Sequence, residues 1–455
     1  MTLKKWTHPL VTGTVILTLT GLVSRFIGFF YRIFLSNVFG AEGMGLYQLI
    51  SPVLALSFSL TVSGIQTAIS KYVASETSTR DYKSSFRTLW TGFLLAMALS
   101  VICALGIYVY AEPIAANLLL EERTAPLLRI IALSIPMASV HSCINGYFYG
   151  IRKTGIPAFS QLAEQVCRVG SVYLIYFICQ KQRLTPTISF AVVGLVIGES
   201  ASMIVSVVAI LARAHQVFPA LSFSHCRAAQ PFSSVVSVYR RITGQLLQLA
   251  VPLSANRLVL NLLQSVEAIY IPNRLMAYGL SNADALSVYG VLTGMSLPLI
   301  LFPSAITNSI SVLLLPVVSE ADANGNQTTV RRAIFTSIRC CILLGFFCTA
   351  LFLVFGRLAG QLLFHSELAG SFILTLSFLC PFMYIASMLN SILNGLGKTI
   401  QTFLFSVVSL LLRLLFVFFA IPSFGIQGYL WGMLASQMLQ TLLCTISAFH
   451  VSHKQ

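Results

Sequence analysis

The chain has 455 residues, of which 56% are apolar and only 9% are charged, and its formal net charge is +15. A typical soluble domain carries about 25% charged residues, so this chain has too few polar side chains to cover a soluble globule. The composition instead suits helices solvated by lipid, and we attribute the positive charge to membrane topology rather than to nucleic-acid binding. The ten cysteines include no CxxC pair, so we predict no metal and no cofactor.

Apolar stretches, each long enough for the roughly 20 residues of a transmembrane helix, recur along the whole chain. They predict about twelve spans, at 10–36, 44–70, 88–110, 125–149, 156–179, 187–212, 244–270, 285–318, 333–355, 369–396, 399–420 and 426–449. We therefore predict an all-α polytopic membrane protein with two six-helix lobes. The lobes cover residues 1–213 and 244–455, and residues 214–243 form a polar cytoplasmic linker.

Lys and Arg alternate between the loops on the two sides of these spans. Sixteen of the 28 lie on the side of the N-terminus and five on the opposite side. Because short cytoplasmic loops collect Lys and Arg, this bias predicts that both termini of a multi-pass cell-membrane protein are cytoplasmic.

The two halves of the sequence resemble each other. An offset of 245 residues aligns Pro136 with Pro381, Asn145 with Asn390, Gly150 with Gly395, Lys153-Thr154 with Lys398-Thr399, and Arg168 with Arg413. With six spans in each half, both halves have the same orientation. This predicts a parallel repeat, an arrangement in which transporters commonly bind substrate between the halves.

Charged and amide side chains inside the spans predict the binding site. Arg25 and Arg32 share one helical stripe, and Arg257, Asn261, Gln264 and Glu267 share a broad face of the seventh span. We expect the stripes of spans one and seven to meet in a polar, cationic cavity. The candidate substrate-binding residues are Arg25, Arg32, Arg257, Gln66, Asn261, Gln264 and Asn308.

The cationic character of this predicted cavity favours an anionic ligand such as a phosphate or pyrophosphate, because Arg matches phosphate geometry. Glu164 and Arg168, four residues apart, are interpreted as a structural polar pair. Arg413 has no acidic residue nearby in the sequence, and both a packing role and a functional role are open for it.

The N-terminal region carries a further pattern, Gly21-Leu-Val-Ser-Arg25-Phe-Ile-Gly28, followed by Phe39-Gly-Ala-Glu-Gly and by Gly64-Ile-Gln-Thr-Ala-Ile-Ser-Lys71. It resembles the stage V sporulation protein B-like polysaccharide-biosynthesis membrane proteins of the multidrug/oligosaccharidyl-lipid/polysaccharide exporter superfamily, which includes lipid II flippases. The resemblance implies a V-shaped flippase with alternating access and a cavity role for Arg25. It also implies an undecaprenyl-type lipid-linked sugar as substrate, and a cell-wall or sporulation context.

We therefore expect a flippase for a lipid-linked oligosaccharide, acting as a monomer among membrane lipids. The alternative is a cation-coupled multidrug antiporter of the same fold, for which Glu267 is the candidate coupling residue. Buried Arg outnumber buried Glu, which favours the flippase. A membrane enzyme is not expected, since the sequence lacks DxD, HExxH and Walker motifs.

Overall fold

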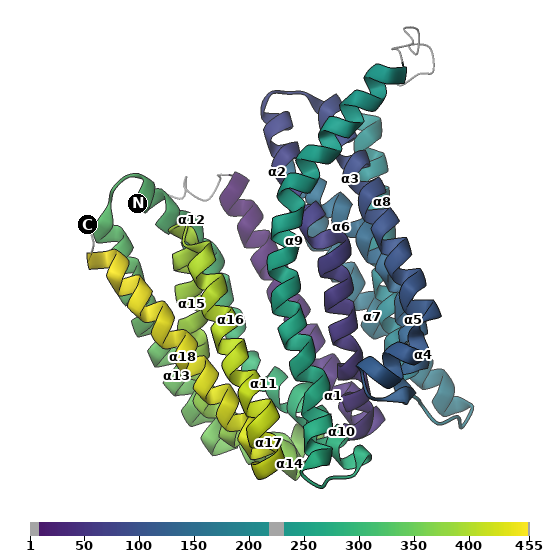
Figure 1. Cartoon of the computed structure of the whole chain (residues 1–455), viewed down its shortest axis with the longest axis vertical. Coiled ribbons are helices and arrows are strands. Elements are labelled where there is room, and N and C mark those ends of the chain that lie inside the picture. The colour runs from purple at the N-terminus through teal and green to yellow at the C-terminus, as the bar shows by residue number, and fades with distance from the viewer. Residues whose placement is uncertain (1–8, 218–231, 454–455) are drawn as a thin grey trace. The chain divides into compact units, whose positions relative to one another are not determined.

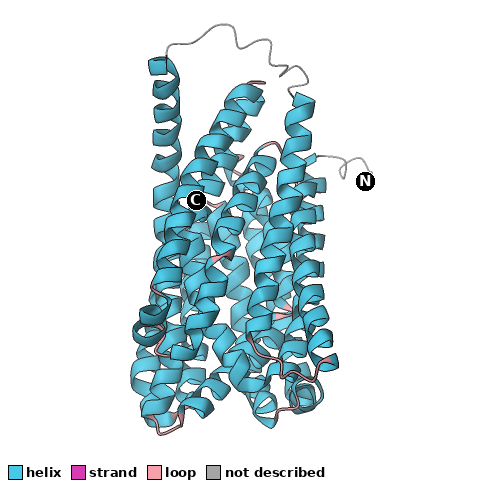
Figure 2. Cartoon of the chain, turned by 90° about the vertical axis from the view of Figure 1, so that its right-hand side faces the viewer, coloured by secondary structure: helices cyan, strands magenta, loops and turns pink. Residues whose placement is uncertain are grey.

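A computed structural model describes residues 9–217 and 232–453. Within these ranges every regular element is a helix (Figure 2). This follows from the sequence, because a helix satisfies all its backbone hydrogen bonds within one apolar segment. The structure thus agrees with the predicted all-α membrane fold.

The helices of the first half follow the order of the predicted spans (Figure 1). They are α1 (Pro9–Phe58), η2 (Ser59–Ser63), α2 (Gly64–Ser78), α3 (Tyr82–Val109), α4 (Ala111–Pro113), η3 (Ile114–Leu118), η4 (Glu122–Thr124), α5 (Ala125–Ala132), α6 (Ser134–Gly150), α7 (Gly155–Lys181) and α8 (Ser189–Val217).

The second half begins with a long helix, and short breaks again divide several spans. Its elements are α9 (Phe232–Ala277), α10 (Asn282–Gly290), η5 (Val291–Ser296), α11 (Leu297–Leu301), α12 (Ser304–Ala323), α13 (Gln327–Phe364), α14 (Glu367–Leu376), η6 (Ser377–Leu379), α15 (Cys380–Gly395), α16 (Thr399–Leu415), η7 (Phe416–Ala420), α17 (Ile421–Phe424) and α18 (Ile426–His453).

In the described residues, ten helices are long and apolar enough to cross a membrane, and an eleventh span is formed if the bent pair Glu122–Ala132 and Ser134–Gly150 counts as one. The first of the ten, Val15–Ser78, has 64 residues and would be ~96 Å long if straight, about three times the thickness of a bilayer core. It is interrupted at Gly40, whose φ is 70°. Read as two spans, it brings the count to the twelve expected.

The chain forms two compact units that divide it differently from the predicted lobes. One unit comprises 1–27 and 50–261, and the other comprises 28–49 and 262–455. Because α1 and α9 are long, different parts of each pack into different units. The predicted linker 214–243 is also shorter than expected, since α8 continues to Val217 and α9 begins at Phe232; the rest of it lies outside the described residues.

The same internal packing recurs in both units. In the first, α6 packs against α2, α3 and α8, and α7 packs against α8. In the second, α15 packs against α12, α13 and α18, and α16 packs against α18. Helices α2, α3, α6, α7 and α8 thus correspond in chain order to α12, α13, α15, α16 and α18. The repeat seen in the sequence is therefore also a repeat of helix packing.

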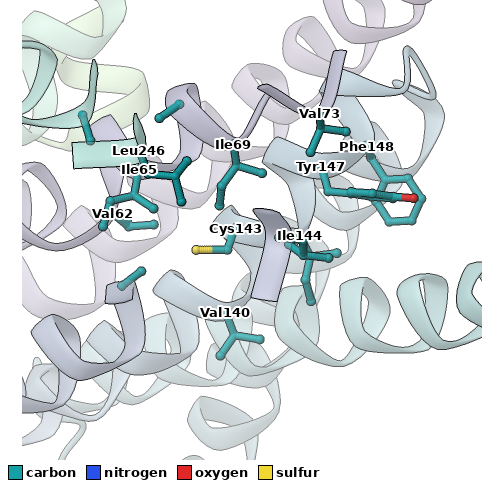
Figure 3. Packing of buried hydrophobic residues seen from close by; sticks show 14 of the residues in the cluster. Val62, Ile65, Ile69, Val73, Val140, Cys143, Ile144, Tyr147, Phe148 and Leu246 are labelled. Carbon is teal, nitrogen blue, oxygen red and sulfur yellow. The ribbon is translucent and has the colours of Figure 1, made fainter. Parts of the chain in front are cut away.

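The core of the first unit lies where α2, α3 and α6 meet. Ile69, Val73, Cys143, Tyr147 and Phe148 are all fully buried there, and Leu246 of α9 packs onto the same cluster (Figure 3). Polar residues around this core are therefore held on rigid helices.

Candidate functional site

A row of polar contacts joins α9 to the π-helix η2 and the end of α1 within the first unit. The Arg257 Nη1 donates to the Ser63 carbonyl at 3.4 Å. The Asn261 Nδ2 lies 2.5 Å from the Ser59 Oγ and donates to the Ala55 carbonyl at 3.2 Å. We call these five residues, Ala55, Ser59, Ser63, Arg257 and Asn261, the α9 seam.

Two local features of the sequence create the α9 seam. A Cβ atom at Gly64 would lie 2.3 Å from the Ala250 carbonyl oxygen and 2.4 Å from the Ser254 Oγ, so only glycine lets the two backbones approach this closely. The residues before Gly64 form a π-helical turn, which loosens the usual backbone hydrogen-bond ladder and is frequent at functional sites. Together they bring Arg257 and Asn261 onto η2.

The structure therefore pairs span seven with span two, whereas the sequence analysis expected its polar stripe to meet that of span one. Gln66, the predicted site residue on span two, is half-buried, and its backbone carbonyl lies against Gly146 of α6. Close packing at Gly64, a backbone property, brings α9 against span two. The expected meeting of spans one and seven stays a prediction.

Two arginines of the first unit have no carboxylate partner among the described residues. Arg25 on α1 and Arg257 on α9 are both exposed, and neither forms an ion pair with a carboxylate in the part of the chain that the structure describes. Among the described residues, the one hydrogen bond of the Arg257 side chain is its long contact with the Ser63 carbonyl. A cation within a span should face a wet cavity or bind an anion, so these two groups can receive an anionic ligand.

The remaining candidates lie in the second unit. Arg32 is half-buried, with Tyr47 close enough to interact electrostatically. Gln264 is exposed, and Asn308 accepts a hydrogen bond from Ser387 at 2.9 Å. Among the described residues, no hydrogen bond joins these three side chains to one another. Asn308 instead helps to hold α12 against α15.

Glu267, which the sequence analysis placed with Arg257 and Asn261 on a broad face of the seventh span, is engaged inside the second unit. It is buried, its Oε2 accepts from the Arg413 Nη2 at 2.6 Å, and its Oε1 accepts from the Tyr429 hydroxyl at 2.6 Å. Ten residues separate Arg257 from Glu267, which leaves them roughly 80° apart around the helix. Charge balance could have revealed the pairing, since Glu267 is the one clear carboxylate in the predicted second-half spans.

Glu164 and Arg168 form an ion pair on α7. Two further residues, which the sequence analysis did not assign to the site, join them: Glu199 of α8 lies 3.7 Å from the Arg168 Nη2, and its other oxygen lies 2.8 Å from the His141 Nε2 of α6. His141 is the one histidine in the predicted spans, a signal that could have identified this cluster.

A groove of ≈ 680 Å³ opens on the first unit between α3, α6, α8 and the start of α9. Its walls are apolar, with Trp90 and Phe93 among them, and Lys83 and Arg87 also line it. Apolar walls with basic residues suit a membrane lipid. None of the predicted site residues lines it.

The helical spans, the parallel repeat and the polar groups held within the spans define a membrane transporter. Residues 10–322 match the family model of the polysaccharide biosynthesis proteins. The chain therefore belongs to the polysaccharide biosynthesis protein family.

Individual relatives agree with this assignment. The chain is 28% identical to stage V sporulation protein B of Bacillus subtilis (strain 168), over 95% of this chain and 82% of that protein. It is 22% identical to the lipid II flippase MurJ of the same organism, over 89% of this chain and 75% of that protein.

Solved structures show the fold. An inward-facing MATE family multidrug resistance transporter of the MOP superfamily matches with a TM-score of 0.66 at 16% identity, covering 94% of each chain. A MOP superfamily transporter from Pyrococcus furiosus matches with a TM-score of 0.59 at 14% identity, covering 98% of this chain and 96% of that one. The predicted exporter fold is thus confirmed.

Proposed function

We propose that this transporter is a flippase that moves a lipid-linked oligosaccharide with a pyrophosphate group across the cell membrane. One of the relatives named above, at 22% identity, is a lipid II flippase, which supports this substrate class. The undecaprenyl-type substrate, the monomeric state and the cytoplasmic termini belong to the same proposal.

One contrast among the arginines carries the proposal. Arg168 and Arg413 are neutralised by carboxylates of the protein, whereas Arg25 and Arg257 are exposed and have no such partner among the described residues. A guanidinium group left without an internal anion can bind the two phosphates of a lipid carrier through paired hydrogen bonds. Arg32 and Gln264 in the second unit, and Gln66 in the first, are further candidates for polar contacts with the ligand.

The test is translocation of fluorescent lipid II in proteoliposomes by Arg25→Ala and Arg257→Ala variants. A hydrogen bond to a charged group contributes roughly 1.5–3 kcal/mol, so each variant should flip about tenfold more slowly or worse. Arg25→Lys and Arg257→Lys should recover part of the rate, since they restore the charge but not the planar fork.

Arg339→Ala is the matched control. Arg339 is also an exposed span arginine without an ion pair in the described residues, but it lies on α13 in the second unit, whereas Arg25 and Arg257 belong to the first. Equal loss in all three alanine variants would point to a general effect of charge on insertion. Full activity in both Arg25→Ala and Arg257→Ala would remove these residues from the site.

The multidrug antiporter of the same fold remains the second candidate. It is supported by likeness of fold alone, at 16% identity or less in the structures described above. Its proposed coupling residue, Glu267, is already engaged by Arg413 and Tyr429. Export of cationic dyes by the wild-type protein, without movement of lipid II, would favour the antiporter.

A further inference from the structure

Four titratable or charged side chains from three helices meet inside the first unit. His141 comes from α6, Glu164 and Arg168 from α7, and Glu199 from α8. The His141 Nε2 lies 2.8 Å from the Glu199 Oε2, and the Arg168 Nη2 lies 3.7 Å from the Glu199 Oε1 and pairs with Glu164. Their side chains are only 13–19% exposed. We call this group the His141 cluster.

The His141 cluster lies deep in its helices, with each member about two turns or more from either helix end. Such a position makes unbalanced charge costly. With a neutral imidazole, two carboxylates and one guanidinium leave one excess negative charge. A proton on the imidazole cancels this charge, and histidine is the side chain whose charge changes most readily near neutral pH.

Few charged groups act directly on the His141 cluster. The charged groups that act on Glu164 are Glu199, Arg168 and His141 themselves. Arg129 of α5, which packs on α8, is engaged by Glu112. Among the described side chains of the first unit, the other ionisable groups on these helices and on those packed against them are Lys71, Tyr72, Glu76, Tyr82, Lys83, Arg87, Cys103, Tyr108, Cys143, Tyr147, Tyr149, Cys167, Tyr173, Tyr176, Cys179, Lys181, Arg213, Tyr239, Arg240, Arg241 and Arg257.

A separate row of buried hydroxyl and amide groups lies near the cluster on the same three helices. The Ser160 Oγ lies 2.6 Å from the Ser202 Oγ and 3.0 Å from the Ser206 Oγ, and the Ser206 Oγ donates to the Asn145 Oδ1 at 3.5 Å. A hydroxyl both donates and accepts hydrogen bonds, so such a row can pass a proton along.

This polar row begins one helical turn from the cluster. Ser160 is four residues from Glu164, Asn145 is four from His141, and Ser202 is three from Glu199. The row leads toward the helix ends that carry Arg152, Lys153 and Arg213, which we predict to be cytoplasmic. The cluster therefore holds a proton acceptor, and the polar row lies between it and one set of helix ends.

A metal ion fits this site less well. Ligand atoms of His141, Glu164 and Glu199 all lie within 4.8 Å of one another, a spacing that a cation could bridge. Arg168, however, pairs with both carboxylates, so it would repel a cation and compete for its oxygen ligands. A proton, in contrast, needs only one free lone pair on His141 or on a carboxylate oxygen.

We propose that the His141 cluster is a proton-binding site, in which His141 and Glu199 hold the proton while Arg168 and Glu164 position them, and that its loading is coupled to transport. The coupling half rests on the proposed flippase function, whereas the proton-binding half does not.

The first experiment tests proton binding by NMR of the full chain labelled with ¹⁵N-histidine in lipid nanodiscs. Among the imidazole signals of the seven histidines, the His141 signal should change from the doubly to the singly protonated form as the pH rises through neutrality. It should be absent in His141→Gln and present in the matched control His450→Gln, since His450 is exposed. In Glu199→Gln the imidazole loses its anionic partner, so a larger share of it should be neutral at each pH.

A His141 signal that keeps one protonation state wherever the protein stays folded would overturn the proposal. So would a signal that responds to added Zn²⁺ or Na⁺ at fixed pH but not to pH itself, because that result would identify a metal site. If His141→Gln does not fold, the wild-type titration and Glu199→Gln still decide.

The second experiment tests coupling in proteoliposomes, with the membrane potential clamped at zero and a pH-sensitive dye inside. Addition of fluorescent lipid II to the wild-type protein should move protons, and His141→Gln should abolish proton movement while His450→Gln retains it. Equal proton movement in His141→Gln would refute coupling at this site. Failure of the wild-type protein to flip lipid II would refute the flippase and the coupling but leave the NMR result standing.

Discussion

The Arg413 Nε lies 2.6 Å from the Glu267 Oε1 inside the second unit, although 146 residues separate the two along the chain. Arg413 is the repeat mate of Arg168, which is also neutralised by carboxylates. Both halves therefore contain the arginine and pair it with a carboxylate, but the carboxylate comes from a different helix in each half. The first unit uses acids on α7 and α8, and the second uses one on α9.

This ion pair predicts strong non-additivity. Removing one partner of a buried pair leaves an uncompensated charge and typically costs about 3–5 kcal/mol. Glu267→Leu and Arg413→Leu should each sharply lower the melting temperature in detergent, whereas the double variant should recover much of the loss. Tyr429→Phe, which removes the hydroxyl's hydrogen bond to Glu267 but leaves the ion pair intact, is the milder control. Additive losses in the double variant would mean that the two residues do not depend on each other.

Gly64 should be intolerant of a single methyl group. In Gly64→Ala the new Cβ would overlap the Ala250 carbonyl, so α9 must move and the Arg257 and Asn261 contacts with η2 should weaken. We expect lower thermal stability together with lower lipid II translocation. Gly106→Ala on α3 is the matched control, since no atom lies within 4 Å of its added Cβ and alanine favours helix by about 1 kcal/mol. Equal effects at both sites would argue against close approach at Gly64.

The hydrogen bond between Asn261 and Ser59 should appear as a coupling energy. Asn261→Ala and Ser59→Ala should each destabilise the protein by about 1 kcal/mol. The double variant should cost less than the sum, as measured by chemical or thermal unfolding in the same detergent. Asn308→Ala with Ser59→Ala is the control pair and should be additive, because these residues belong to different units.

The predicted orientation can be tested with a thiol reagent that does not cross membranes. Thr79 and Gln182 are both exposed next to helix ends, on what we predict to be opposite sides. In intact cells Gln182→Cys should be labelled and Thr79→Cys should not, while inverted vesicles should give the reverse. The protein without an added cysteine is the control, because it shows how strongly the native cysteines are labelled. Labelling of both variants from the same side would contradict the predicted topology.

The fold was predictable largely because of the membrane. Hydropathy located the spans, since about 20 apolar residues in lipid leave helix as the available structure. The helix breaks were harder to predict. Gly40 interrupts a 50-residue helix, and α9 extends over 46 residues, so parts of each belong to different units. Residue ranges chosen at loops therefore missed the unit boundaries.

The residues of the candidate site were also only partly predictable from the sequence. Composition and spacing identified Arg25, Arg257 and Asn261 as polar residues within spans, and the i, i+4 spacing identified the Glu164–Arg168 pair. Spacing along one helix says nothing about which neighbour a side chain meets. It therefore missed the meeting of His141 with Glu199, the contact of span seven with span two, and the pairing of Arg413 with Glu267.

The sequence by itself determined the helical membrane architecture, the repeat and the family, because these depend on hydropathy and on residue patterns along the chain. Tertiary structure decided which charges are neutralised and which remain available to a ligand. That outcome depends on how closely two helices can approach, as at Gly64 and Ala250, and on contacts between residues more than a hundred positions apart.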